Sequence, residues 1–194
     1  FLYLRALMEI LLRQVKIIDP SSPFPQQTKD ILVKNGLITE VGEINDSTAQ
    51  QININGLHVS AGWIDIFSNF CDPGFEYKET LETGANAAAA GGYTNVMILP
   101  NTNPVVHNKS GVEYIVQRSK DFAVSIHPVA AVTKNTEGKE LAEMYDMHQS
   151  GAVAFSDGVN PIQSSGLLVK ALQYLKAIDK VIIQLPDDKS ISPS

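Results

Sequence analysis

From residue 61 onward the sequence alternates short apolar runs with amphipathic stretches, and this alternation constrains the fold more than any other feature. The apolar runs predict buried strands beginning near residues 62, 93, 122, 152 and 181. Helices are predicted between them, and strand starts recur about every 30 residues, the length of one strand–helix unit. Near-continuous apolar strands of this kind predict an α/β protein with a parallel sheet covered by helices.

Two architectures satisfy that pattern. A doubly wound sheet would be complete with five strands. In a (β/α)₈ barrel of about 250 residues, the same five strands would make up only about the first half. The pattern alone leaves both open. No Gly-x-Gly-x-x-Gly follows the first strand and no phosphate-binding Gly-x-x-x-x-Gly-Lys-Ser/Thr occurs, so nothing in the sequence supports nucleotide binding.

Local signals predict where several helices begin and end. The first helix is expected over 80–90, with Gly91-Gly92 as a left-handed stop. Ser110 and Glu113 have the spacing of a capping box for the second helix. The third helix is predicted from an apolar face that starts at Leu141, and Ser164 or Ser165 is expected to cap the fourth.

Residues 8–60 predict a small β-module of at least four strands. Asn35-Gly36 between two apolar runs is a strong hairpin signal, because both central positions of a type I′ turn need positive φ. A further strand pair is expected around Asn55-Gly56. Met8 is interpreted as the natural start, with residues 1–7 as upstream residues; the alternative is that they form a genuine first strand or helical turn.

Composition narrows the function classes. The net charge is −6 and the pI is near 5.1, with no run of Lys or Arg, which argues against nucleic acid and anionic membranes as partners. No apolar run reaches the roughly 18 residues that span a bilayer. One cysteine excludes an internal disulfide framework and any zinc site built on a cysteine pair, so a cytoplasmic location is expected.

Several segments taken together resemble the dihydroorotases of the amidohydrolase superfamily, in particular the type associated with aspartate transcarbamoylase in pyrimidine synthesis. They are Gly62-Trp63-Ile64-Asp65, Asp72-Pro73-Gly74, 79–84, 87–94, the Pro-Asn-Thr-Asn-Pro stretch at 100–104, and Ala154-Phe155-Ser156-Asp157. The resemblance runs from residue 8 to about 190. It implies a small β-sandwich module over 8–60 and, over 61–194, the first half of a TIM barrel, with about five βα units.

Members of that family hydrolyse a cyclic amide, interconverting dihydroorotate and carbamoyl aspartate, with one or two zinc ions. Zinc lowers the pKa of its bound water to about 7, which supplies hydroxide at neutral pH. The resemblance places a His-x-His ligand pair and a substrate-binding arginine at the positions of Phe67, Asn69 and Cys71. A phenyl ring cannot bind zinc, Asn is a weak neutral ligand, and Cys cannot hold a carboxylate as arginine does.

The same comparison covers three further positions. Leu185 stands where the family has a histidine ligand at the end of the fifth strand. Asp157 is a candidate remnant of the metal bridge after the fourth strand, and Asn101 matches a substrate-binding asparagine. Each residue also has a purely structural interpretation. Asp157 is then a loop or helix-cap residue, Asn101 a turn former, and Cys71 a small apolar substitute.

These substitutions predict a catalytically degenerate homologue that binds no zinc and supports an assembly with aspartate transcarbamoylase. No catalytic residue is expected to be intact, and the retained substrate-contact positions would be Asn101, Asn69 and Cys71. One rival is an active amidohydrolase with a divergent metal site. Another is a metal-free small-molecule binding module that uses Asn101, Asn69 and Asp157. Because five strands would leave an open sheet edge, residues 1–194 alone are expected to form homo-oligomers or be poorly soluble.

Overall fold

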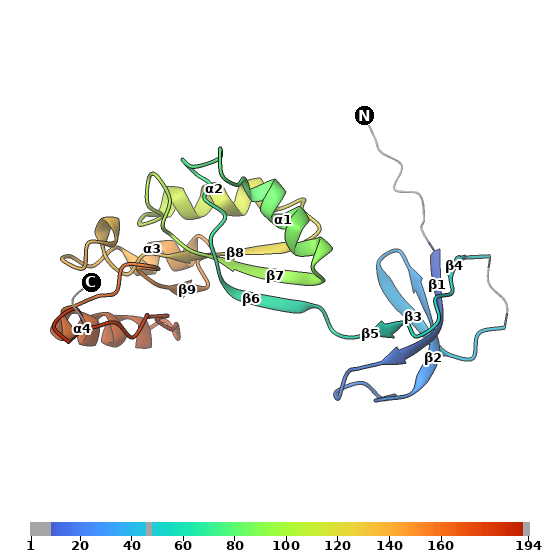
Figure 1. The fold of residues 1–194 in the computed structure, drawn as a ribbon. Coiled ribbons are helices and arrows are strands. Elements are labelled where there is room, and N and C mark those ends of the chain that lie inside the picture. The colour runs from blue at the N-terminus through green and yellow to red at the C-terminus, as the bar shows by residue number, and fades with distance from the viewer. Residues whose placement is uncertain (1–8, 46–47, 192–194) are drawn as a thin grey trace. The chain divides into compact units, whose positions relative to one another are not determined.

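The computed structural model describes residues 9–45 and 48–191, and the chain divides into two compact units that meet between Ala61 and Gly62 (Figure 1). The predicted upstream residues 1–7 and the proposed start at Met8 lie outside the described residues. Among the described residues no helix is long and apolar enough to cross a membrane.

The first unit is a β-module built on a three-stranded antiparallel meander. Its strands are β1 (Glu9–Ile17), β2 (Thr28–Lys34) and β3 (Leu37–Gly42), with β2 between the other two. Asn35 and Gly36 join β2 to β3 with φ values of 53° and 79°. Positive φ at both positions is what a type I′ turn requires, so the predicted hairpin is confirmed.

The predicted strand pair around Asn55-Gly56 is wrong. The two strands there are β4 (Gln50–Ile52) and β5 (His58–Val59), and both run parallel to β1 without pairing to each other. Gly56 has a φ of 74°, so a turn does form between them. Both segments pair with the edge of β1 that β2 leaves free, β4 along Ile10–Leu12 and β5 along Lys16–Ile17, and the turn lies between these two pairings.

A buried ion pair ties the module together. Asp30 is 4% exposed and accepts hydrogen bonds from the Arg13 guanidinium at 2.7 Å and from the backbone N–H of Gln14 at 2.9 Å. Burial by itself would raise the pKa of Asp30, but these hydrogen bonds and one from the Ile44 N–H outweigh it and hold the pKa below its ordinary value. The carboxylate is therefore charged and fully engaged at neutral pH.

The second unit contains a four-stranded parallel sheet in the order β6-β7-β8-β9. The strands are β6 (Trp63–Ser68), β7 (Tyr93–Ile98), β8 (Ser125–Ala130) and β9 (Ala154–Phe155). Helices α1 (Leu81–Ala90), α2 (Lys109–Ser119), α3 (Met144–Gln149) and α4 (Ser165–Lys176) alternate with them. A 3₁₀ turn, η1 (Lys134–Thr136), precedes α3. The predicted α/β class, a partial barrel preceded by a small β-module, is confirmed.

The predicted fifth strand is reduced to one bridge. Ile182 pairs in parallel with Phe155 of β9, through hydrogen bonds from the Phe155 N–H to the Val181 carbonyl and from the Ile183 N–H to the Phe155 carbonyl. Beyond it, residues 183–189 form no strand. An apolar run supplies strand-forming residues but not partners, and β9 is only two residues long, so the ladder stops after one position.

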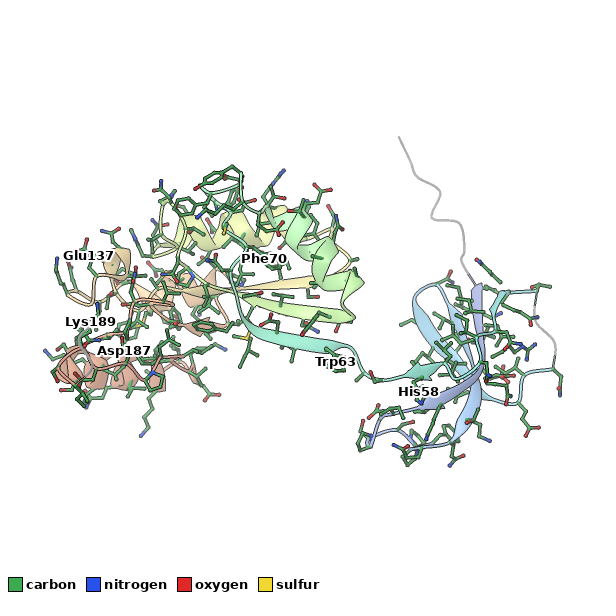
Figure 2. All side chains as sticks on the ribbon, in the orientation of Figure 1. His58, Trp63, Phe70, Glu137, Asp187 and Lys189 are labelled. Atoms are coloured by element: carbon green, nitrogen blue, oxygen red, sulfur yellow. The ribbon has the colours of Figure 1, made fainter. Side chains whose placement is uncertain are left out.

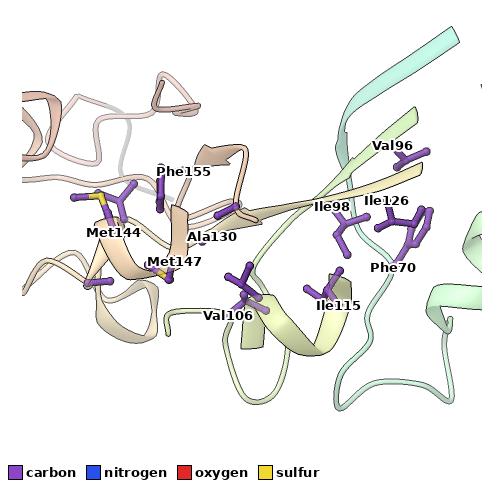
Figure 3. Packing of buried hydrophobic residues seen from close by; sticks show 14 of the residues in the cluster. Phe70, Val96, Ile98, Val106, Ile115, Ile126, Ala130, Met144, Met147 and Phe155 are labelled. Atoms are coloured by element: carbon purple, nitrogen blue, oxygen red, sulfur yellow. The ribbon is translucent and has the colours of Figure 1, made fainter. Parts of the chain in front are cut away.

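The hydrophobic core of this unit lies between the sheet and its helices. Val96 and Ile98 of β7 pack with Ile126 of β8 and with Ile115 of α2 (Figure 3). Asn95 and Met97, which alternate with the core residues of β7, point to the opposite face. That second face is much less covered among the described residues, since Ile64 and Ile66 of the edge strand β6 are 57% and 55% exposed.

The helix starts differ from the predictions at two places. The second helix begins at Lys109 rather than after the predicted cap Ser110, because the side chain of Asn108 accepts the N–H of Gly111 and caps the helix two residues earlier. Leu141 lies outside α3, in a bridge with Thr133. By contrast, Ser164 caps α4, and Gly92 has the positive φ expected after α1.

Candidate functional site

The candidate site is the edge of the sheet formed by the carboxyl ends of β6, β7, β8 and β9, where parallel barrels place their ligand-binding loops. Six sequence-predicted residues map near this edge: Phe67, Asn69, Cys71, Asn101, Asp157 and Leu185. Hydrogen bonds join Asn69 to Cys71 within one loop, and join Asn101 to Asp157 across two loops. In the described part of the chain, no hydrogen bond links Phe67, Asn69, Cys71 or Leu185 to the pair Asn101 and Asp157.

Asp157 is a buried carboxylate whose two oxygens accept hydrogen bonds from other residues of the chain. It is 1% exposed, and its Oδ1 accepts the backbone N–H groups of Val132 and Thr133, each at 2.9 Å. Its Oδ2 accepts the hydroxyl of Thr133. Burial raises the pKa of Asp157 and outweighs these hydrogen bonds, which lower it. Both carboxylate oxygens therefore hold the loop after β8 against the loop after β9.

Asn101 is bound to the same loop. Its Nδ2 donates to the Asp157 carbonyl at 3.1 Å, and its Oδ1 accepts the N–H of Val159 at 3.2 Å. Between these residues Gly158 has a φ of 61°, and a Cβ there would lie 1.6 Å from the Asn101 Oδ1. Thr133 and Gly158 are thus the site residues that sequence reasoning missed; the Ser-Asp-Gly turn was a signal for Gly158, and none existed for Thr133.

Phe67, Asn69 and Cys71 occupy the end of β6 and the loop that follows. Phe67 is half-buried, and its N–H donates to Asp65 at 2.9 Å. The exposed Asn69 accepts the N–H of Cys71 with its Oδ1 at 3.1 Å and helps to line a cavity of about 270 Å³ beside α1. Cys71 is a half-buried free thiol whose backbone has a φ of 61°. Leu185 lies in the non-strand segment after Ile182 and is 38% exposed.

The loop after β6 is anchored by Asp72. This buried carboxylate accepts the Leu81 N–H at the start of α1, at 3.0 Å, and the Tyr114 hydroxyl of α2 at 2.8 Å. Burial and the hydrogen bond to Asp72 raise the pKa of Tyr114, so the phenol remains a donor at neutral pH. Asp72 therefore ties the Cys71 loop to two helices.

Gly74 in that loop permits a close approach that no other residue allows. Its φ is 96°, and a Cβ would lie 1.8 Å from the backbone carbonyl oxygen of Asn103. We expect Gly74→Ala to lower the free energy of unfolding by roughly 2 kcal/mol more than Gly92→Ala, measured by urea denaturation. Gly92 is the matched control, because its φ of 84° is similar but a Cβ there meets nothing within 4 Å. Equal losses in the two variants would refute the contact with Asn103.

The residues present do not fit the zinc ion that the resemblance implies. Phe67 and Leu185 carry no donor atom, and the donor oxygens of Asn69 and Asp157 are held by the chain's own N–H and hydroxyl groups. Within residues 9–45 and 48–191, no group of three His, Cys, Asp or Glu side chains could hold a metal. His107 and His127 lie in this unit; Nδ1 of His107 accepts the Asn135 N–H, and Nε2 of His127 is hydrogen-bonded to the Asn95 Oδ1.

Comparison with known proteins gives one family. A family model described as dihydro-orotase-like matches residues 57–193. Dihydroorotases of Geobacter sulfurreducens and Syntrophus aciditrophicus are 41% and 39% identical, and each match covers 95% of this chain and 44% of the relative. The chain thus spans less than half the length of these curated relatives.

Solved structures share the fold at low identity. An L-hydantoinase (dihydropyrimidinase) from Arthrobacter aurescens superposes with a TM-score of 0.76 at 21% identity, covering 95% of this chain and 42% of its own. A dihydroorotase crystal structure gives 0.62 at 17% identity, covering 90% of this chain and 50% of its own. The matched family model spans more than half of the chain, and the chain therefore belongs to the dihydro-orotase-like family.

Proposed function

We propose that this chain is a cytoplasmic dihydroorotase homologue of pyrimidine biosynthesis that has lost zinc-dependent hydrolysis and acts as a structural partner of aspartate transcarbamoylase. The observation that carries the proposal is the chemistry of three positions. Phe67, Asn69 and Leu185 stand where the resemblance assigns histidine ligands, and two of them have no donor atom. Without those ligands, hydroxide is not generated at neutral pH by the family route.

The state of Asp157 supports the same conclusion. A carboxylate that bridges metals needs its oxygens free, whereas here both accept hydrogen bonds from the Val132–Thr133 segment. Moving this carboxylate onto a metal would leave two buried N–H groups without partners, at a cost of about 1–3 kcal/mol each. Its retained role is the structural connection between the loops after β8 and β9.

The activity test uses the full-length protein that carries this chain. We expect no hydrolysis of dihydroorotate and no cyclisation of carbamoyl aspartate above the buffer rate, with or without added zinc, because no hydroxide is held beside the ring carbonyl. The dihydroorotase of Geobacter sulfurreducens, 41% identical, is the positive control. Turnover that a chelator abolishes would favour the rival function, an active amidohydrolase with a divergent metal site. The 41% and 39% identity to the two dihydroorotases supports that rival.

The partnership has its own test. The full-length protein and the aspartate transcarbamoylase of the same organism, mixed and passed over a sizing column, are expected to elute together ahead of either alone. Strictly independent elution at micromolar concentrations would refute the structural role while leaving the loss of catalysis standing.

A further inference from the structure

A polar cavity of about 530 Å³ lies among three loops of the barrel unit: 135–138 before α3, 159–163 before α4, and the segment after Ile182. Its volume is in the range of small-molecule sites. None of the positions that the family resemblance singles out lines it. The lining includes Asn135, Thr136, Glu137, Gln163, Asp187 and Lys189, of which Glu137, Asp187 and Lys189 lie near one another in Figure 2.

The walls of this cavity are joined by side chains. Asn160 Nδ2 donates to the Thr136 hydroxyl at 3.0 Å and connects the first two loops. Gln163 connects the second and third, because its Nε2 donates to the Asp187 carbonyl at 3.0 Å and its Oε1 accepts the Lys189 N–H at 2.8 Å. The cavity is therefore preformed by the chain's own hydrogen bonds.

The loop before α3 that lines the cavity has a backbone conformation that non-glycine residues rarely adopt. Asn135 and Thr136 are consecutive non-glycine residues with φ values of 54° and 55°. Such residues cost free energy and cluster at ligand sites, where the surrounding structure holds them. Thr136 is only 6% exposed and lies at the base of the cavity, whereas the side chain of Asn135 is exposed and open to a ligand.

The charges that line the cavity are of both signs and in part unpaired. Glu137 contacts Lys139 at 3.0 Å through one oxygen. In the described part of the chain, no hydrogen bond or ion pair engages the Asp187 carboxylate, the Lys189 ammonium or the Asn135 side-chain amide. One free anion, one free cation and a neutral amide within the same cavity complement a ligand that carries the opposite pair of charges and an uncharged polar group.

We propose that this cavity binds a small zwitterionic amino acid with an uncharged polar side chain. Lys189 pairs with the ligand carboxylate, Asp187 pairs with its ammonium group, and the amide of Asn135 contacts its side chain. The lining, which sums to one negative charge, disfavours ligands with a second carboxylate. This site does not depend on the loss of zinc chemistry proposed above.

L-Asparagine is the probe, titrated by calorimetry into the full-length protein that carries this chain. We expect saturable binding, and at least roughly tenfold weaker binding in both Asp187→Asn and Lys189→Met, since each removes a charge-assisted hydrogen bond. Lys170→Met is the matched control, an exposed lysine on α4 outside the cavity, and is expected to bind as the unaltered chain does. All three positions are exposed, and circular dichroism checks that each variant is folded.

Two further probes test the charge pairing on the unaltered chain, where folding is not in question. Succinamic acid lacks the ammonium group and β-alaninamide lacks the carboxylate, so each is expected to bind at least about tenfold more weakly than L-asparagine. Absence of L-asparagine binding, equal affinity of either probe, or a loss caused by Lys170→Met would overturn the proposal.

Discussion

Asp157→Ala is expected to lower the free energy of unfolding by roughly 4 kcal/mol, the largest loss that we predict for a single substitution in this chain. The reason is local. Removing the carboxylate leaves the N–H groups of Val132 and Thr133 without an acceptor in a position that is 1% exposed, and opens a void beneath Thr133. Urea denaturation of the full-length protein, followed by circular dichroism, measures the loss.

Asp157→Asn is the matched control, because an amide keeps an acceptor oxygen for both N–H groups and removes the buried charge. We expect it to lose only about 1 kcal/mol at neutral pH. An equal and negligible loss in both variants would mean that Asp157 does not connect the two loops and is available for another role.

The unaltered protein and Asp157→Asn should also differ in how their free energy of unfolding depends on pH. Because burial raises the pKa of Asp157, the folded state binds its proton more tightly than the unfolded state does. Stability contributed by the protonated group is therefore present below the unfolded pKa of about 3.9 and is lost as the pH rises through the folded pKa. Asp157→Asn lacks this loss.

The second large effect is a gain of metal binding. The combination Phe67→His, Asn69→His and Leu185→His in the full-length protein is expected to bind about one zinc per chain, where the unaltered protein binds none, because three imidazoles supply a zinc donor set. Zinc content after dialysis measures the gain. Zinc that remains absent from a folded triple variant would mean that these positions do not converge on one point.

A matched control separates a designed site from adventitious binding. Phe67→His and Asn69→His together, with Leu185 unchanged, keep two of the three donors, and leucine is close to histidine in volume. We expect this variant to bind zinc at least roughly tenfold more weakly, since losing one imidazole removes a full coordinate bond. Equal binding in both would place the zinc elsewhere.

The parts of the fold that could be predicted from the sequence are those that a few neighbouring residues determine. The type I′ turn at Asn35-Gly36 and the Ser164 cap of α4 follow from two or three neighbouring residues, and both were predicted. Whether 181–185 and the segments around Asn55-Gly56 form strands, and with which partner, depends on strands that are distant in the sequence. Sequence pattern identifies strand-forming residues but does not identify their partners.

The candidate site shows the same division. Asn101 and Asp157 could be named from the sequence, but their hydrogen bonds to 157–159 and 132–133 join residues more than 20 positions apart, and no spacing predicts those contacts. The mixed-charge cavity combines three loops that carry no motif. Its one sequence signal, polar residues after successive predicted strands, is common to loops of every kind.

The central claim, that this chain has lost the family's zinc chemistry, is tested most directly by the zinc content of the full-length protein purified without chelator, measured by elemental mass spectrometry. The account predicts well under one zinc per chain, unchanged after incubation with zinc and dialysis. One zinc or more per chain that is retained through dialysis, with catalytic turnover that is lost when the zinc is removed, would contradict it.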